Sequence, residues 1–466
     1  MTKKRITQQL KQLEAQLTGE VWFAPDLQYH ARRQVFNRAV DARPLAILEV
    51  HNNEDVCKAI RFAKKHHIQI SVKGGGHSTS GSCIVDDGLV LDMSVLKQIQ
   101  FDTNKQRVIV AAGVRNFELD QATNQHLQAV PLGTCPDVGV VGAAMGGGIG
   151  YLSCAYGLSC DSIESITVVN ADAQILIVNS AQHSDLFWAL RGGGGCQFAV
   201  VMDMTFRTYD VPKLVYGGVI EWPISECAAI LKQYSAKVLL SSNDFFLYAY
   251  ISHAASCESK ISLMVFSMAD ETQSQQLFTD IANWRPGASS NVGAKSYLAI
   301  QSNTYEEGLY TYWKNGIIDT GLSAACIDDI AQCAKNCPED GGGIMLDPLG
   351  GAIAEHPHSH SAFAHRDGRF ICSFTGLSDT NYLSEDIRLW VDQSHKVMKK
   401  HFNDHSYQNY EDLAIDEISS YFGQHAQRLR QLKLHYDPEN VFYGSLARER
   451  QYEDPKWLSI SAITQN

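Results

Sequence analysis

The sequence predicts an α+β protein with at least two domains, and three observations support this. The chain has 466 residues, more than one hydrophobic core usually serves. Eighteen of its 35 glycines lie between Gly74 and Gly195, which indicates loops whose backbone makes the contacts. After Pro212 the glycine density falls, and alternating apolar stretches predict an antiparallel sheet with helices between its strands. Pro212 is therefore the expected domain boundary.

The first elements are expected to be a helix and then a unit of helix, strand and glycine turn. Near the N-terminus, Ile6, Leu10 and Leu13 recur at helical spacing among polar residues, which predicts an amphipathic helix and not a signal peptide. Asn52 is expected to cap the next helix. The short strand "IQISV" at 68–72 then leads directly into the glycine turn "KGGGHS".

The remaining elements follow from alternation, helical spacing and turn residues. Asn170 and the residues after it predict the turn of a β-hairpin, and the glycines from Gly192 onward predict the end of a helix. The pattern predicts the hairpin over 165–178, that helix from 184, strands over 198–206, 245–252 and 260–268, and helices over 381–402 and 426–436. After the last helix, "DPENVF" predicts a turn that returns the chain to a core.

Composition limits the class of partner. Lys and Arg number 39 against 51 Asp and Glu, and the net charge of −12 argues against nucleic acid or an anionic membrane. A small-molecule ligand is expected instead. No run approaches the roughly 18 apolar residues of a membrane span, and no export signal is visible, so a soluble cytoplasmic protein is expected. The twelve cysteines form no C-x-x-C pair, which fits neither a zinc ribbon nor a disulfide framework.

Two glycine-rich stretches are the strongest candidates for ligand binding. "SVKGGGHS", residues 71–78, follows a strand, and its amide groups could converge on a pyrophosphate, although a tight turn explains the octapeptide equally well. The second stretch, "GTCPDVGVVGAAMGGGIGYLS", covers residues 133–153. It holds only a fragment of the G-x-G-x-x-G dinucleotide fingerprint, because Ser153 stands where the third glycine belongs. A nicotinamide-binding domain is therefore disfavoured.

Together with "RGGGGCQFAVV" at 191–201, "YQNYEDL" at 407–413 and "YDPENVF" at 436–442, these stretches resemble the berberine bridge enzyme-like flavoprotein oxidases of the vanillyl-alcohol oxidase superfamily. The resemblance runs from about residue 35 to about residue 450, and the motifs in this order are specific as a set. It implies a PCMH-type FAD-binding domain made of residues 1–212 and 405–466. Residues 213–404 would form a substrate-binding domain between them.

The resemblance also implies covalent FAD. His77 matches the histidine that bonds the 8-methyl carbon of the flavin, and Cys135 matches the cysteine that bonds the neighbouring ring carbon, although a buried inert thiol is the common fate of cysteine. Val138 falls where the family gates dioxygen, and valine there resembles the oxidases, although it could equally be a core valine. The other cofactor contacts implied are Lys73, Gly74, Gly75, Gly76, Ser78, Gly139, Gly142, Gly146, Gly147, Val200 and Asn409.

The implied reaction is hydride transfer from an alcohol or hemiacetal carbon to FAD, with dioxygen as the final acceptor and hydrogen peroxide as product. Sugars, oligosaccharides and glycosylated secondary metabolites are the substrate classes. The substrate hydroxyl must lose a proton, and Tyr407 matches the residue assigned as the base. Because a free tyrosine titrates near 10, Tyr407 needs a cation or a hydrogen-bond donor beside it, and Arg366 is a candidate.

Some positions depart from the family pattern, and other functions stay open. Ala143, Gln197, Ala199 and His425 replace residues that are usual in the family, which weakens any inference about the substrate. Amine oxidation, as in hydroxynicotine oxidases, is one alternative, and a flavin-binding protein without catalysis is another. A zinc-dependent hydrolase is a third, because His356, His358 and His360 alternate as metal ligands on a strand do, although Pro357 favours a solvated loop.

Overall fold

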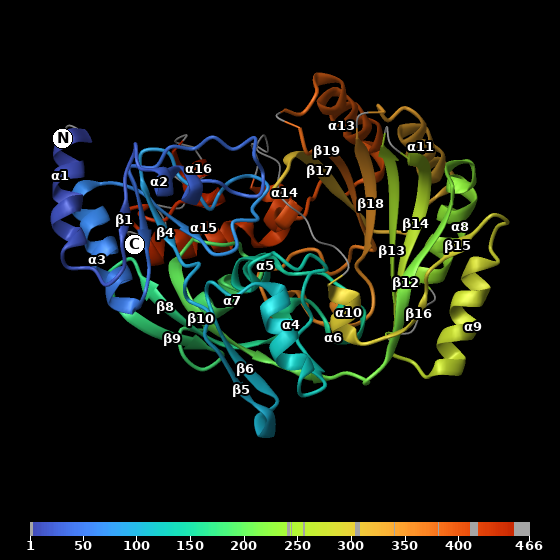
Figure 1. Ribbon diagram of the computed structural model, residues 1–466, viewed down its shortest axis with the longest axis horizontal. Coiled ribbons are helices and arrows are strands. Elements are labelled where there is room, and N and C mark those ends of the chain that lie inside the picture. Colours follow the sequence, from blue (N-terminus) through green and yellow to red (C-terminus); the bar gives the residue numbers. More distant parts are fainter. Residues whose placement is uncertain are drawn as a thin grey trace.

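A computed structural model describes residues 3–239, 243, 245–254, 257–302, 308–339, 341–380, 382–410 and 418–451. The N-terminal elements and the C-terminal helices α15 (Ala426–Tyr436) and α16 (Ser445–Gln451) lie together at the left of Figure 1, and a large sheet from the middle of the chain stands at the right. No helix in the described ranges combines the length and the apolar character needed to span a bilayer. The α+β prediction is confirmed by this mixture of sheets and helices.

The N-terminal part begins with a small sheet of order β1-β2-β4-β3, in which β2, β4 and β3 are parallel. The predicted cap is confirmed, because the Asn52 side chain accepts a hydrogen bond from the Asp55 amide at 3.0 Å. The predicted N-terminal helix is also found. The elements are α1 (Lys3–Glu14), β1 (Val21–Trp22), α2 (Leu27–Arg32), β2 (Ala46–Glu49), α3 (Asn53–His66), β3 (Ile70–Lys73) and β4 (Leu89–Asp92).

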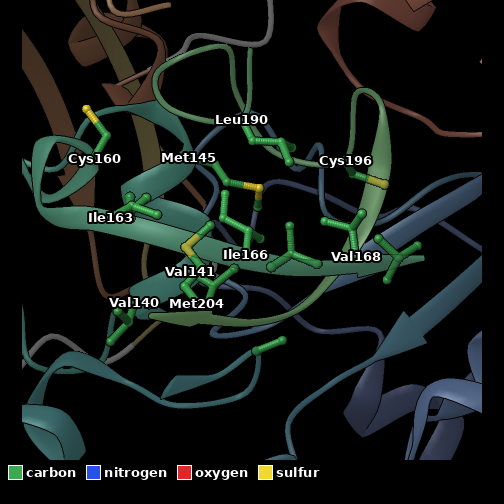
Figure 2. Packing of buried hydrophobic residues seen from close by; sticks show 14 of the residues in the cluster. Val140, Val141, Met145, Cys160, Ile163, Ile166, Val168, Leu190, Cys196 and Met204 are labelled. Carbon is green, nitrogen blue, oxygen red and sulfur yellow. The ribbon is translucent and has the colours of Figure 1, made fainter. Parts of the chain in front are cut away.

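A five-stranded antiparallel sheet of order β5-β6-β10-β8-β9 follows. The predicted hairpin is confirmed as β8 and β9, which turn at Asn170. Val141 and Met145 of α5 pack beside Ile166 and Met204 of this sheet (Figure 2). The elements are β5 (Ile99–Asp102), β6 (Arg107–Ala111), α4 (Asn116–Asn124), β7 (Gln128–Ala129), α5 (Val140–Gly146), α6 (Ser153–Tyr156), β8 (Ile163–Asn170), β9 (Ile175–Asn179), α7 (Ser184–Ala189), β10 (Ala199–Arg207) and β11 (Tyr209–Asp210).

The middle of the chain forms the predicted antiparallel sheet, which has eight strands in the described ranges. Its path is β15-β12-β14-β13-β18-β19-β17, and β16 also pairs with β12. The elements are β12 (Val215–Pro223), α8 (Cys227–Leu239), β13 (Phe245–Ala254), β14 (Cys257–Ser267), α9 (Glu271–Ala282), β15 (Ser289–Ser290), β16 (Gly293–Lys295), α10 (Tyr297–Gln301), β17 (Tyr310–Ile318), α11 (Ala324–Lys335), β18 (Gly342–Pro348), α12 (Ala352–Glu355), β19 (Phe370–Ser378) and α13 (Glu385–Met398).

The alternation of these strands gives the sheet two different faces. Leu247 and Ala249 of β13 belong to the core shared with α8, α11 and α13. Phe246 and Tyr248 point the other way, toward the core of the N-terminal part. Because successive side chains of a strand point to opposite faces, one strand contributes both to its own core and to the surface that meets the rest of the protein.

The C-terminal segment returns to the N-terminal part. Tyr443 donates its amide hydrogen to the Ile70 carbonyl, and the Ile70 amide donates to the Val441 carbonyl, each at 2.7 Å. Helix α14 (Ser419–Phe422) precedes α15 in this segment. The exact division into 1–212 with 405–466 and 213–404 stays a prediction, and residues 452–466 of it lie outside the described ranges.

Candidate active site

A cavity of about 310 Å³ lies where the two glycine-rich stretches, the C-terminal segment and the inner face of the eight-stranded sheet meet. The residues that line it extend along the chain from Phe36 to Ser445, so they meet only because distant segments converge there. The predicted site residues that line it are Gly74, Gly75, Gly76, His77, Ser78, Cys135, Val138, Gly139, Gly142, Tyr407 and Asn409.

Lys73, Gly146, Gly147 and Val200 lie beside the cavity but not on its wall. Lys73 donates from Nζ to the Arg32 carbonyl at 2.5 Å, and Val200 is fully buried between Ala199 and Val201, which do line the wall. Gly146 and Gly147 support other site residues, since a Cβ at Gly146 would lie 1.9 Å from Oδ1 of Asn409 and one at Gly147 would lie 3.2 Å from the Tyr407 hydroxyl. Their contact with a cofactor stays a prediction.

The two glycine stretches touch through their backbones. A Cβ built on Gly75 would lie 2.3 Å from the Gly139 nitrogen, and one on Gly139 would lie 2.6 Å from the Gly75 nitrogen. Backbone atoms cannot move aside as a flexible side chain can. Glycine is therefore required at both positions, and the contact fixes the loop of His77 against the loop of Cys135.

His77 is held in a form suited to nucleophilic attack. Its ring stacks on Phe36, with centroids 4.4 Å apart and planes 17° from parallel. Burial lowers the pKa of His77 to about 4, an effect that the Asp137 charge opposes. At neutral pH the imidazole is therefore uncharged, and one ring nitrogen keeps a free lone pair. Phe36 was not predictable from a motif, because it reaches His77 from a loop outside all of them.

Cys135 lies in a half-buried loop that lines the cavity, and it forms no disulfide within the described residues. The loop is anchored to the start of α4, where the Asn116 amide donates to the Val138 carbonyl at 2.9 Å and the Phe117 amide donates to the Pro136 carbonyl at 3.0 Å. Val138 lines the cavity three residues after the thiol. The thiol and the predicted gate residue therefore share one fixed loop.

Tyr407 is 2% exposed, and its hydroxyl oxygen accepts two hydrogen bonds. The Gly148 amide donates to it at 2.9 Å, and Nδ2 of Asn409 donates at 2.8 Å. Burial raises the pKa of Tyr407, and these donors oppose that rise by favouring the phenolate. Asn315 of β17 accepts from the Tyr407 amide at 2.6 Å and donates to its carbonyl at 3.2 Å, which fixes the backbone of the predicted base.

The helper expected at Arg366 is engaged elsewhere. Its guanidinium donates to Asp161 at 2.7 and 3.1 Å, to the Ile353 carbonyl at 3.0 Å and to Ser361 at 2.7 Å. The Tyr407 hydroxyl instead has two neutral donors beside it, the Gly148 amide and Asn409, which lower its pKa against the larger effect of burial.

Sequence reasoning missed the wall that the eight-stranded sheet contributes. Tyr248, Trp313 and Asp347 project into the cavity from β13, β17 and β18. Asp347 is 4% exposed, its Oδ1 accepts from the Tyr410 hydroxyl at 3.4 Å, and its Oδ2 has no partner among the described residues. Burial raises the pKa of Asp347 to about 7. One signal was available, since Asp347 is the only charged residue in the otherwise uncharged strand "GGIMLDP".

The three alternating histidines do not form one metal site. They lie on a turn and a short 3₁₀ helix, not on a strand, and His358 points to Asp367, with Nε2 and Oδ2 3.0 Å apart. His356 and His360 approach Asp161 at 4.0 and 3.7 Å.

Two arginine side chains already interact with the cluster of Asp161, His356 and His360. Both carboxylate oxygens of Asp161 accept from Arg366, and Nη1 of Arg191 lies 3.1 Å from Nε2 of His360. A divalent metal would face two guanidinium charges at this place and would have to displace their hydrogen bonds. The histidines therefore fit a half-buried polar network with arginine partners better than a zinc-dependent active site.

Segments that line the cavity match known protein families. A family model described as an FAD binding domain matches residues 44–179, and one described as berberine and berberine like matches 406–446. An FAD-linked oxidoreductase of Dictyostelium discoideum is 30% identical over 412 residues, which is 86% of this chain and 87% of that protein. (R)-6-hydroxynicotine oxidase of Paenarthrobacter nicotinovorans is 32% identical over 217 residues, 46% of this chain and 47% of that protein.

The fold is also that of a solved flavoprotein. The structure of glucooligosaccharide oxidase from Acremonium strictum, described as carrying 6-S-cysteinyl, 8α-N1-histidyl FAD, superposes with a TM-score of 0.83 at 24% identity, over 94% of this chain and 98% of that one. The matched FAD-binding segment contains His77 and Cys135, and the matched C-terminal segment contains Tyr407.

The residues present fit a bound flavin. A Cβ at Gly142 would meet no atom within 4 Å, so the backbone of α5 faces open space in the cavity, where a flat ring can approach it. The glycine stretches give the amide groups that a pyrophosphate needs, and an uncharged imidazole and a thiol line the same cavity. The extent of the match to the Dictyostelium protein, with both family segments in order, shows that this chain belongs to the berberine bridge enzyme-like FAD-linked oxidases.

Proposed function

We propose that this oxidase holds FAD through two covalent bonds, at His77 and Cys135, and removes a hydride from an alcohol or hemiacetal carbon. The observation that carries the proposal is the convergence of His77, Cys135 and Tyr407 on one cavity from three distant segments. When bound, FAD supplies the two-electron acceptor and passes the electrons to dioxygen, which leaves as hydrogen peroxide. The remaining steps fall to side chains of the chain itself.

The two attachment bonds use the chemistry of His77 and Cys135 as the structure presents it. Each bond replaces one hydrogen of the side chain and one hydrogen of the flavin, and both hydrogens leave on dioxygen as hydrogen peroxide. The low pKa of His77 keeps its nitrogen nucleophilic at neutral pH. The glucooligosaccharide oxidase structure, with its cysteinyl and histidyl FAD, supports this double linkage by analogy.

The other predicted cofactor contacts complete the FAD site. The amide groups of the first glycine stretch hold the pyrophosphate, and Asn409 lies where it can reach the flavin edge while it donates to Tyr407. Val138 lines the same cavity and would act as the gate for dioxygen when FAD is bound. Residues 1–212 and 405–466 form this FAD-binding domain, and residues 213–404 supply the substrate wall.

The proton of the substrate hydroxyl goes to Tyr407. Two hydrogen-bond donors on its oxygen favour the phenolate, against the larger effect of burial. Asp347 lines the same cavity, and its pKa of about 7 lets it hold or release a proton near neutral pH. Tyr407 is the proposed base, and Asp347 is a second group of the cavity that can carry a proton.

The wall built by the sheet favours a sugar. Trp313 and Tyr410, with ring centroids 5.1 Å apart, present aromatic surface to the cavity, and Asp347 offers hydrogen-bond acceptors for hydroxyl groups. The amine alternative rests on the similarity to the hydroxynicotine oxidase, and an ionised Asp347 would also attract an ammonium group. Alcohol oxidation and amine oxidation predict different substrates for the same cavity. A screen of sugars against cyclic amines therefore distinguishes the two.

The first test is the intact mass and visible spectrum of the denatured protein, for the wild type and for His77→Ala and Cys135→Ala. Double attachment predicts that one FAD mass and yellow colour remain with the denatured wild type and with each single variant, and are lost in the double variant. A wild type that releases all its FAD on denaturation would show that neither bond exists. Peroxide production with oligosaccharides, simple alcohols and cyclic amines then assigns the substrate class.

A further inference from the structure

A buried polar cluster joins α4 to α10, which lie side by side (Figure 1). Nε2 of Gln301, at the end of α10, donates to Oδ2 of Asp120 at 3.0 Å and to the Gly133 carbonyl at 3.4 Å. Asn116 and Asp120 lie one helical turn apart on the same face of α4. All three side chains are at most 2% exposed, so each of these bonds forms away from water.

The cluster leads to the loop of Cys135. Nδ2 of Asn116 donates to the Cys135 carbonyl at 2.9 Å and to the Gly133 carbonyl at 3.2 Å. Gln301 shares the second acceptor, so the Gly133 carbonyl receives one donor from each helix. The backbone next to Cys135 is therefore held by Asn116 of α4. It is also held by Gln301 of α10, a helix that follows the first strands of the eight-stranded sheet.

The cluster also contains polar atoms that an ordinary packing role leaves unexplained. Oδ1 of Asn116, Oδ1 of Asp120, Oε1 of Gln301 and the Tyr297 hydroxyl have no hydrogen-bond partner among the described residues. Burial raises the pKa of Asp120 to about 8, so its carboxyl is mostly protonated at neutral pH and offers an O–H donor to this set of acceptors. A neutral carboxyl fits this place better than a carboxylate, because no cation is bound to it.

We propose that Asn116, Asp120 and Gln301 form a positioning network that sets the Cys135 loop for attachment of the flavin. The inference rests on the proposed function, because it takes Cys135 as the second attachment point. These residues do not touch the cavity, so they act through the loop and not on the reacting atoms. The network also makes the placement of Cys135 depend on α10, a helix of the predicted substrate-binding segment.

The test measures attachment through each anchor separately. In a His77→Ala background, covalent flavin reports on Cys135 alone, and in a Cys135→Ala background it reports on His77 alone. Asp120→Ala and Asp120→Asn are placed in both backgrounds, and covalent flavin is read as intact mass after denaturation. Asparagine is the matched control, because it is neutral, keeps an acceptor for Gln301 and keeps one donor.

In the His77→Ala background, Asp120→Ala is expected to lower covalent flavin by roughly tenfold, because a small displacement of a reacting group has an effect of this order or larger. Asp120→Asn is expected to keep it near the level of the background. In the Cys135→Ala background, neither change should alter attachment through His77. Gln301→Leu should reproduce the loss seen with Asp120→Ala.

Two results would overturn the inference while leaving the proposed function intact. One is unchanged Cys135 attachment in Asp120→Ala, and the other is an equal loss of both attachments, which indicates a general defect in folding. A third result would instead contradict the proposed function. If the His77→Ala background carries no covalent flavin and the wild type yields no Cys135-linked peptide, Cys135 is not an attachment point and the network has no role in attachment.

Discussion

Asp347 is the residue whose chemistry can be tested most directly. Its carboxyl has a pKa of about 7 and lines the same cavity as the predicted base. Because Asp347 can receive a proton only when it is ionised, the rate of flavin reduction should rise as the pH increases through about 7. Asp347→Asn should lose this rising limb of the pH profile. It should also reduce flavin about 10²-fold more slowly, as expected for a lost acid–base group. Stopped-flow measurement of flavin bleaching at a series of pH values gives both quantities.

Tyr410 supplies the control for this assignment. Its hydroxyl donates to Asp347, and this bond lowers the pKa that burial raises. Tyr410→Phe should therefore move the limb to higher pH without abolishing it. If the limb stays at the same pH in both variants, another group titrates, and the role given to Asp347 is wrong.

At the residue scale, the sequence predicted the site only where a motif was local. His77 and Cys135 stand inside glycine stretches that are recognisable by themselves, and both lie on the cavity. Phe36 and Asp347 stand outside any motif, and each reaches the site through a fold that joins distant segments. Contacts of that kind depend on the packing of whole sheets, which the pattern of one strand does not encode.

At the scale of elements, the contact of the two glycine loops is the most constrained feature. Gly139→Ala should destabilise the protein by about 1–3 kcal/mol, because its Cβ would overlap the Gly75 backbone and the loops must separate. The separation also draws the loop of Cys135 away from that of His77, so covalent flavin should fall. Thermal midpoint and intact mass together measure the two effects.

Gly142→Ala is the matched substitution for this prediction, since its Cβ meets no protein atom within 4 Å. It changes the same residue type a few positions away, and the packing of the loops gives no reason for the protein to lose stability. Equal losses of stability in the two variants would mean that overlap between the loops is not the cause.

Most elements were predictable because their signals are periodic or local. Alternation predicted the strands that became β13 and β14, and the cap at Asn52 predicted the start of α3. The order of the strands in the eight-stranded sheet was not predictable. It places β18 between β13 and β19, and only this order brings Asp347 to the cavity.

At the scale of the whole molecule, the C-terminal segment is joined to the N-terminal part through a buried ion pair. Nζ of Lys433 donates to Oδ2 of Asp437 at 2.6 Å and to the carbonyls of Gln197 and Phe442 at 2.8 and 3.0 Å. Asp437 accepts in turn from the amides of Val441 and Phe442, at 2.8 and 2.9 Å. The pair is fully buried, and Gln197 lies two residues before strand β10, so the pair ties α15 to the start of a strand of the five-stranded sheet.

Lys433→Met should therefore destabilise the protein by about 3–5 kcal/mol, because it leaves the Asp437 carboxylate buried without its cation. The double variant Lys433→Met/Asp437→Asn should unfold at a higher temperature than the single variant, since asparagine carries no charge and keeps an acceptor for one of the two amides. Thermal unfolding of the three proteins measures the difference. If the double variant is no more stable than the single variant, the unpaired charge of Asp437 is not the cause of the instability. The loss of the three hydrogen bonds that the Lys433 ammonium group donates would then be the cause. The same segment carries Tyr407 into the cavity. If the two ends of the chain fold as one domain, the variants that lose stability should also lose covalent flavin.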